Sequence, residues 1–142
     1  MADVALVRKR VRAAIDAARR DQAERRTRVT DATRLYDTFL ETCATPAFRM
    51  IVNVLKSEGL GFEVMTPSGG VRLASERHRD DAIAIELDGS VDPPQPVVTI
   101  TRARGGRSLR TERAVKAGTP LAQLTEDDVI DMIVEELRPW LG

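Results

Sequence analysis

The clearest structural signal in the chain comes from residues 60–114, which read LGFEVMTPSGGVRLASERHRDDAIAIELDGSVDPPQPVVTITRARGGRSLRTERA. Two runs of alternating apolar and polar residues, 62–66 and 71–75, flank the turn sequence Pro-Ser-Gly-Gly. Glycine adopts the backbone conformations that tight turns need, so this segment predicts a β-hairpin. A loop at Ser68 and Gly69 would place Val64 opposite Leu73, and opposed residues would then share a face of the sheet.

Three further runs extend this pattern, at residues 82–87, 97–104 and 107–113. The last two are joined by Gly105 and Gly106, a strong signal for a tight turn. Prolines between residues 93 and 96 argue against a central strand there, because proline donates no ladder hydrogen bond. The sequence therefore predicts a five-stranded antiparallel meander over residues 60–114.

Helical patterns flank this sheet on both sides. Residues 2–44 contain no proline or glycine and predict either one long helix or a helical hairpin broken near residues 26–30. A second helix is expected at 46–58, with Thr45 as its N-cap, and a C-terminal helix at 125–138. We expect an α+β fold in which residues 1–142 form a single domain and helices cover one face of the sheet.

The first half of the N-terminal helix carries a narrow stripe of apolar and small residues. They recur every three or four positions and comprise Val4, Val7, Val11, Ile15 and Ala18. Such spacing is typical of helices that pair with a second helix, and it predicts self-association as a homodimer. Packing against the chain's own domain is one alternative. A basic amphipathic helix lying on a membrane or on nucleic acid is another, although the stripe lacks tryptophan and phenylalanine.

Charge is balanced over the whole chain but unevenly distributed. The sequence holds 22 basic and 22 acidic residues, and 19 of the basic residues are arginine. Residues 1–30 carry nine bases and four acids, residues 97–120 six bases and one acid, and residues 121–142 one base and six acids. Complementary blocks of this kind can steer a chain or its partner into register. A genome rich in G and C would explain the arginine bias without any functional role.

The last hairpin is dense in arginine. Its five arginines are Arg102, Arg104, Arg107, Arg110 and Arg113. A two-stranded ribbon with arginines near its tip can enter a nucleic-acid groove or hold phosphates, so nucleic-acid or anion binding is an alternative function. The ribbon contains no aromatic residue for base stacking. Surface pairs between these arginines and the acidic C-terminal helix, around Asp127, Asp128 and Asp131, are the competing interpretation.

No catalytic, cofactor or metal motif stands out in the sequence. The lone histidine, His78, lies in a charged connection between strands and is expected to be exposed, and the lone cysteine, Cys43, is expected in the core. One cysteine allows no internal disulfide, and the N-terminus lacks the apolar core of a secretion signal. No apolar run is long enough to span a membrane. We expect a cytoplasmic protein without cofactor, metal site or membrane contact.

The residues 61–76 resemble segments of bacterial proteins of unknown role, a resemblance that implies no activity. A helix-covered antiparallel sheet with a dimerising helix is also similar to the general plan of some small secretion chaperones, at the level of fold alone. The leading hypothesis is a non-enzymatic binding or interaction protein that self-associates through its N-terminal helix. Nucleic-acid or anion binding through residues 102–113 is the alternative, and a small enzyme of unknown class is the third. The sequence identifies neither the ligand nor the partner.

Overall fold

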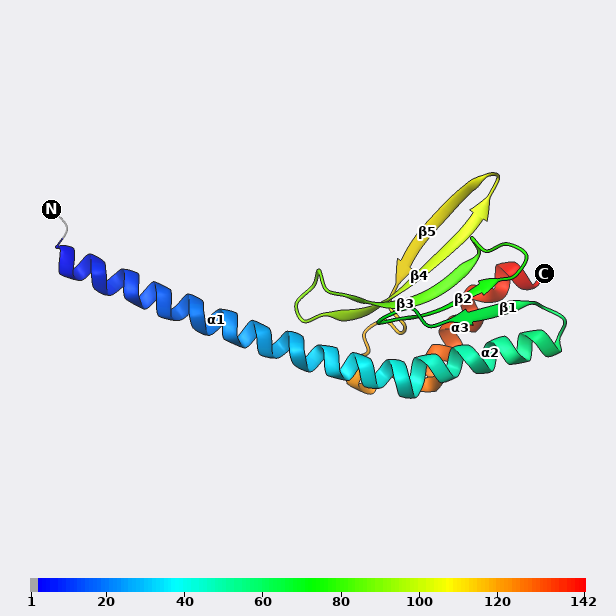
Figure 1. Ribbon diagram of the computed structural model, residues 1–142, viewed down its shortest axis with the longest axis horizontal. Helices are drawn as coiled ribbons and strands as arrows, with labels where there is room; N and C mark the ends of the chain where they lie inside the picture. Colours follow the sequence, from blue (N-terminus) through cyan, green and yellow to red (C-terminus); the bar gives the residue numbers. More distant parts are fainter. Residues whose placement is uncertain (1–2) are drawn as a thin grey trace.

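The computed structural model describes residues 3–142 and has the predicted α+β architecture. In chain order the elements are α1 (Val4–Phe39), the π-helical turn η1 (Leu40–Ala44), α2 (Thr45–Ser57), β1 (Phe62–Met65), β2 (Val71–Ser75), β3 (Ala82–Asp88), β4 (Gln95–Arg104), β5 (Arg107–Arg113), the short 3-10 helix η2 (Leu121–Gln123) and α3 (Glu126–Leu141). Helices α2 and α3 lie on one side of the sheet, and the first part of α1 projects far from the rest (Figure 1). We call residues 4–28 the projecting segment and residues 29–142 the body.

The sheet is the predicted antiparallel meander, with strand order β1-β2-β3-β4-β5. Val64 lies opposite Leu73, so the register predicted for the first hairpin is confirmed. Gly105 and Gly106 both have positive φ angles, 53° and 80°, between paired Arg104 and Arg107. Only glycine adopts these angles readily, and the two glycines therefore close the last hairpin with a two-residue turn.

The core lies between the inner face of the sheet and the helices. Leu73, Ile83, Ile85 and Ile100 from the three central strands are at most 1% exposed. Phe48 of α2 and several residues of α3 are equally buried against them. The alternation of apolar and polar residues along each strand is what presents this apolar face to the helices.

Helices α1 and α2 form one continuous helix, which agrees with the single-helix alternative for residues 2–44 and corrects the predicted restart at Thr45. The chain stays helical through residues 26–30, and it does not restart at Thr45. Thr45 has helical backbone angles, and its N–H donates to the carbonyl of Leu40, five residues back. This widened π-type turn carries the helix past Pro46, whose nitrogen donates no hydrogen bond. The helical hairpin is thus replaced by a single helix with a π-type turn in it.

Two other prolines lie inside elements that they were expected to end or exclude. Helix α3 continues through Pro139 to Leu141, beyond the predicted end at residue 138. Trp140 holds this last turn by packing against Phe62, with ring centroids 6.3 Å apart. Pro96 lies in β4, opposite Leu87. It is tolerated because β5 ends opposite Val98, so β4 pairs on only one side at that point.

Candidate interaction surfaces

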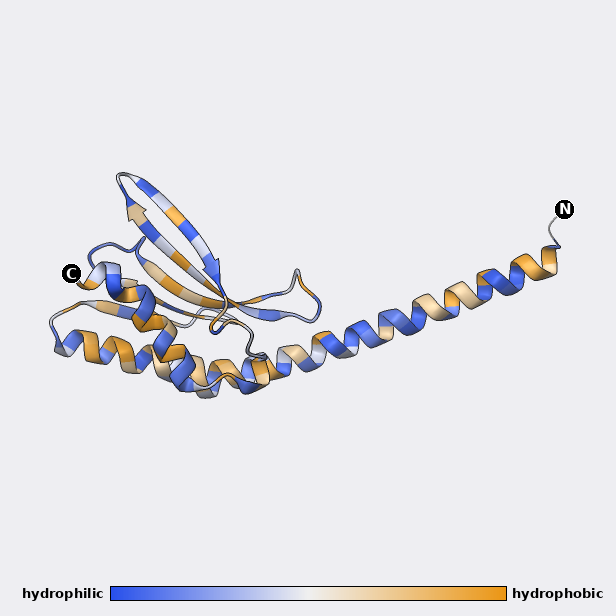
Figure 2. Ribbon diagram, turned by 180° about the vertical axis from the view of Figure 1, so that it is seen from behind, coloured by the Kyte–Doolittle hydropathy of each residue, from blue (hydrophilic) through white to orange (hydrophobic). Residues whose placement is uncertain are grey.

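The projecting segment starts from a capped helix end. The carboxylate of Asp3 accepts a hydrogen bond from the N–H of Ala5, at 2.9 Å, and so satisfies one of the free donors of the first turn. No proline or glycine interrupts the helix from there to the body. At 1.5 Å per residue, the 25 residues of the projecting segment extend about 37 Å. Figure 2 shows hydrophobic and hydrophilic bands alternating along this segment.

The predicted self-association residues all lie on the projecting segment, and all are exposed. The exposed fraction is 72% for Val4, 44% for Val7, 50% for Val11 and 43% for Ile15. Ala18 is exposed as well. We call these five residues the apolar stripe. Nothing in the described part of the chain covers the apolar stripe, so packing against its own domain, one of the sequence alternatives, does not occur in this structure.

The helix meets the body at Arg28. Its guanidinium donates two hydrogen bonds to the carboxylate of Asp92 in the β3–β4 loop, at 2.9 and 3.2 Å. This bidentate pair holds the pKa of Asp92 below its usual range, chiefly through the hydrogen bonds from Arg28. Further along, Ala32, Tyr36 and Phe39 are buried, and the hydroxyl of Tyr36 donates to the carbonyl of Gly69 at 2.7 Å. The position of α1 on the body is therefore fixed by both polar and apolar contacts.

The electrostatics of the projecting segment are dominated by arginine. Residues 4–28 carry nine basic and three acidic side chains, a net charge of +6. Four of the bases lie close together at residues 8–12. Among the described residues, Arg28 is the only base of this segment that forms an ion pair.

The arginine-rich hairpin is divided into residues with different roles. Arg102 donates to the carboxylate of Glu136 at 2.7 Å and stacks over the Trp140 ring, 4.6 Å from its centroid. Arg113 pairs with Glu135 and Glu136, both at 3.1 Å. The predicted pairing with the C-terminal helix therefore occurs, but at its second half. These two arginines connect the β4–β5 hairpin to α3 and are engaged within the fold.

The other three arginines of the hairpin are exposed. Arg110 lies on the opposite face of the ribbon and pairs weakly with Glu112, at 3.5 Å. Arg104 and Arg107 lie opposite each other across the turn, on the same face as Arg102. Within residues 3–142 neither forms an ion pair. The structure thus leaves two of the five predicted anion-binding residues adjacent to each other and available.

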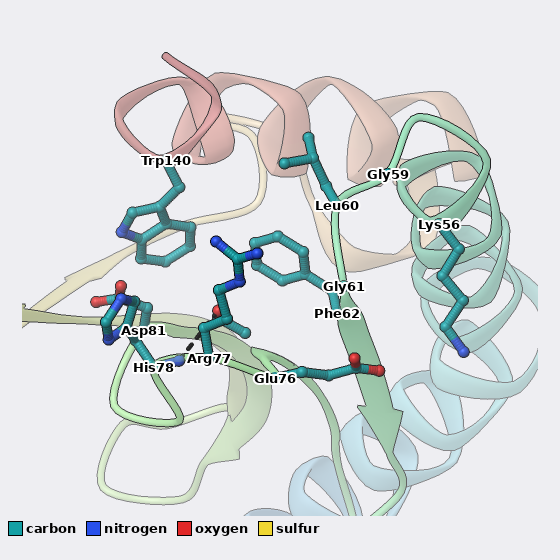
Figure 3. Close-up of a pocket in the computed structure, with 11 residues that line it drawn as sticks. Lys56, Gly59, Leu60, Gly61, Phe62, Glu76, Arg77, His78, Asp81 and Trp140 are labelled. Carbon is teal, nitrogen blue, oxygen red and sulfur yellow. Dashed lines mark hydrogen bonds between the residues drawn. The ribbon is translucent and has the colours of Figure 1, made fainter.

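A cavity of about 600 Å³ opens at the end of the body away from the projecting segment. Figure 3 shows Trp140 of α3 on one side and Phe62 of β1 beside it, with Arg77 extending from the β2–β3 connection toward both rings. His78 and Asp81 line the same space. Aromatic walls with a few charged groups can hold a small polar molecule. No sequence motif predicts this cavity, although the chain's single tryptophan is a signal for it.

Two of the polar groups that line the cavity are used by the fold. The hydroxyl of Ser75 accepts from the backbone N–H of His78 at 3.2 Å, and the carboxylate of Asp81 accepts from the backbone N–H of Ala103 at 2.8 Å. His78 is exposed, as predicted. Ser75 therefore supports a turn rather than contacting the imidazole as a nucleophile would. No catalytic triad or comparable arrangement follows from these contacts.

The remaining candidates are Cys43 and metal ligands. Cys43 is half-buried and packs at the edge of the core, close to its predicted place. Across residues 3–142 no group of three or more histidine, cysteine, aspartate or glutamate side chains is arranged to hold a metal ion. In the same part of the chain, no helix is both long and apolar enough to cross a membrane.

Comparisons with family models, curated proteins and solved structures find no match to this chain.

Proposed function

We propose that this chain is a non-enzymatic binding or interaction protein of the cytoplasm that self-associates through the projecting segment of α1. The observation that carries the proposal is the exposure of the apolar stripe on a helix that leaves the body. An exposed row of valine and isoleucine side chains at three-four spacing is the pattern that a second helix buries.

The stability of the projecting segment supports the same proposal. In proteins, most of the stability of a helix comes from packing of its apolar face rather than from helix propensity. Between Val4 and Arg28, in the described part of the chain, Arg28 is the only residue that forms a hydrogen bond or an ion pair with the body. A second helix lying on the apolar stripe would supply the missing packing and would keep the segment helical.

Sedimentation velocity of the full chain, beside a shortened chain that begins at Asp21, tests self-association. The shortened chain retains Ala32, Tyr36 and Phe39, which are buried in the core. A chain shortened as far as residue 44 would lose these side chains, and its core would be incomplete. We expect the full chain to sediment as a dimer and the shortened chain as a folded monomer. A full chain that remains monomeric at 100 micromolar, roughly, would refute the proposal, since a dimer of only moderate affinity forms at that concentration.

Anion binding by the β4–β5 hairpin is a second candidate, favoured by one observation. Arg104 and Arg107 lie directly opposite each other, and like charges in this position destabilise a hairpin unless an anion lies between them. If single-stranded RNA binds there, the double variant Arg104→Ala/Arg107→Ala lowers the slope of log affinity against log salt by about 1.4. Arg110→Ala on the opposite face is the matched control. An unchanged slope in the double variant would exclude this candidate.

A further inference from the structure

The apolar stripe and the buried face of α1 lie on the same side of the helix. Ala18 of the apolar stripe and Tyr36 of the core are 18 residues apart, which is five full turns at 3.6 residues per turn. The body therefore lies on the side of α1 from which a second helix would approach. Figure 1 agrees with this, because the sheet lies on the concave side of the curved α1–α2 helix.

This arrangement excludes a parallel pairing of two copies. In a parallel pair the apolar stripes would face each other, and both bodies would lie at the same end, between the two helices. Helices that pair through such stripes lie about 8–10 Å apart, which leaves no room for two sheets. The helices would have to diverge at the end of the projecting segment, but α1 is continuous from Val4 to Phe39.

We propose that two copies pair antiparallel along their projecting segments, with one body at each end. This inference rests on the proposed self-association and specifies its geometry. If the residue numbers of facing positions sum to 22, each residue of the apolar stripe lies beside another one, but the basic clusters at residues 8–12 of the two copies also lie beside each other. A sum of about 26 separates these clusters. Val11 then lies beside Ile15 of the second copy, and Val4 lies beside Gln22. Val4 of each copy therefore does not reach the contact of Arg28 with Asp92 in the other.

Charge favours the same orientation. In the antiparallel register, the basic cluster at residues 8–12 faces residues 14–18 of the second copy, which contain three alanines and Asp16. Lys9 and Arg10 lie closest to that aspartate. In a parallel pair the basic cluster of one copy would face the same cluster of the second copy, and the four bases of each chain would repel the four of the other. Complementary charges beside the seam are a known determinant of helix orientation.

The antiparallel dimer has a distinctive length. Val4 to Ser57 is one helical path of about 80 Å at 1.5 Å per residue. Two such paths that overlap over residues 4–22 extend about 130 Å. A parallel dimer would be about 80 Å long, close to the length of one copy. Small-angle X-ray scattering of the full chain, at concentrations where sedimentation gives a dimer, therefore separates the two orientations. We expect a maximum dimension near 130 Å.

Disulfide trapping tests the orientation independently, because different pairs of cysteines come together in antiparallel and in parallel dimers. In a Cys43→Ala background, a mixture of Val4→Cys and Gln22→Cys chains should form the mixed disulfide on mild oxidation. Val4→Cys chains alone should stay unlinked, because their thiols lie about 27 Å apart along the antiparallel pair. Efficient linkage of Val4→Cys chains alone, with a dimer about 80 Å long, would overturn the antiparallel orientation and leave self-association standing. A monomeric mass in sedimentation would overturn both.

Discussion

Replacement of Val11 and Ile15 by serine should separate the two copies of the proposed dimer. These side chains are 50% and 43% exposed in one copy and lie at the centre of the apolar stripe. Burying a whole valine or isoleucine side chain contributes about 1.5–3 kcal/mol, so the exposed half contributes about 1 kcal/mol. Each residue occurs twice in the dimer, and the double variant therefore loses about 4 kcal/mol. We expect the dissociation constant to rise roughly a thousandfold, since about 1.4 kcal/mol corresponds to a factor of ten.

Sedimentation equilibrium measures that constant, and a matched variant isolates the effect of the stripe. Leu6 and Leu35 are also exposed on α1, at 56% and 48%, but lie roughly 120–140° around the helix from the centre of the apolar stripe. Leu6→Ser/Leu35→Ser makes the same kind of change to helix propensity and should leave the dissociation constant within a factor of three or so. An equal loss of affinity in both variants, or a change below tenfold in Val11→Ser/Ile15→Ser, would show that the stripe is not the interface.

Three further predictions concern the body. Tyr36→Phe should destabilise the fold by about 1 kcal/mol in urea, because it removes the hydrogen bond from the hydroxyl of buried Tyr36 to the carbonyl of Gly69. Burial also raises the pKa of Tyr36, so wild-type stability should fall above pH 10 or so, where only the unfolded tyrosine ionises, and Tyr36→Phe should lack that tyrosine's share of the fall. Thr125→Ala should cost about 1 kcal/mol in the same assay, because Thr125 caps α3, and a cost near zero would contradict the capping role. Arg28→Gln should raise the pKa of Asp92 toward about 3.9 in a carbon-detected NMR titration. Since that pKa is depressed in the folded chain, the contact of Arg28 with Asp92 stabilises the fold above about pH 4, and this stabilisation is lost as pH falls through the depressed pKa. An Asp92 pKa that is the same in Arg28→Gln as in the wild type would contradict this.

The sheet was predictable because its determinants are local. A period of two along each strand and glycine-containing turns specify which residues face each other, and a slip by one position would turn Leu73 or Ile83 out of the core. The cap of α3 was predictable for the same reason: Thr125 and Asp128 satisfy each other's backbone N–H groups within a single turn. Patterns of this kind can be predicted from the sequence because the residues that interact are close together along the chain.

The proline positions were not predictable, because tertiary contacts outweigh the local cost. Pro46 is an ordinary helix-start signal, yet the helix passes through it by way of a π-type turn whose neighbours Ala44, Ala47 and Phe48 are fully buried. Pro139 marks a helix end in sequence, but Trp140 packs onto Phe62 and keeps the last turn helical. The partners of Arg102 and Arg113 depended likewise on where α3 crosses the sheet.

The apolar pattern of α1 has two different outcomes along one helix. At Ala32, Tyr36 and Phe39 it is buried in the body, whereas at Val4 and Val11 it is exposed. Periodicity alone cannot separate these outcomes, because the same three-four spacing suits a core and an interface between copies. Because both parts lie on one side of one continuous helix, any partner that covers the exposed part must also fit against the body at its end. A second helix running in the opposite direction meets that condition, and a parallel one does not.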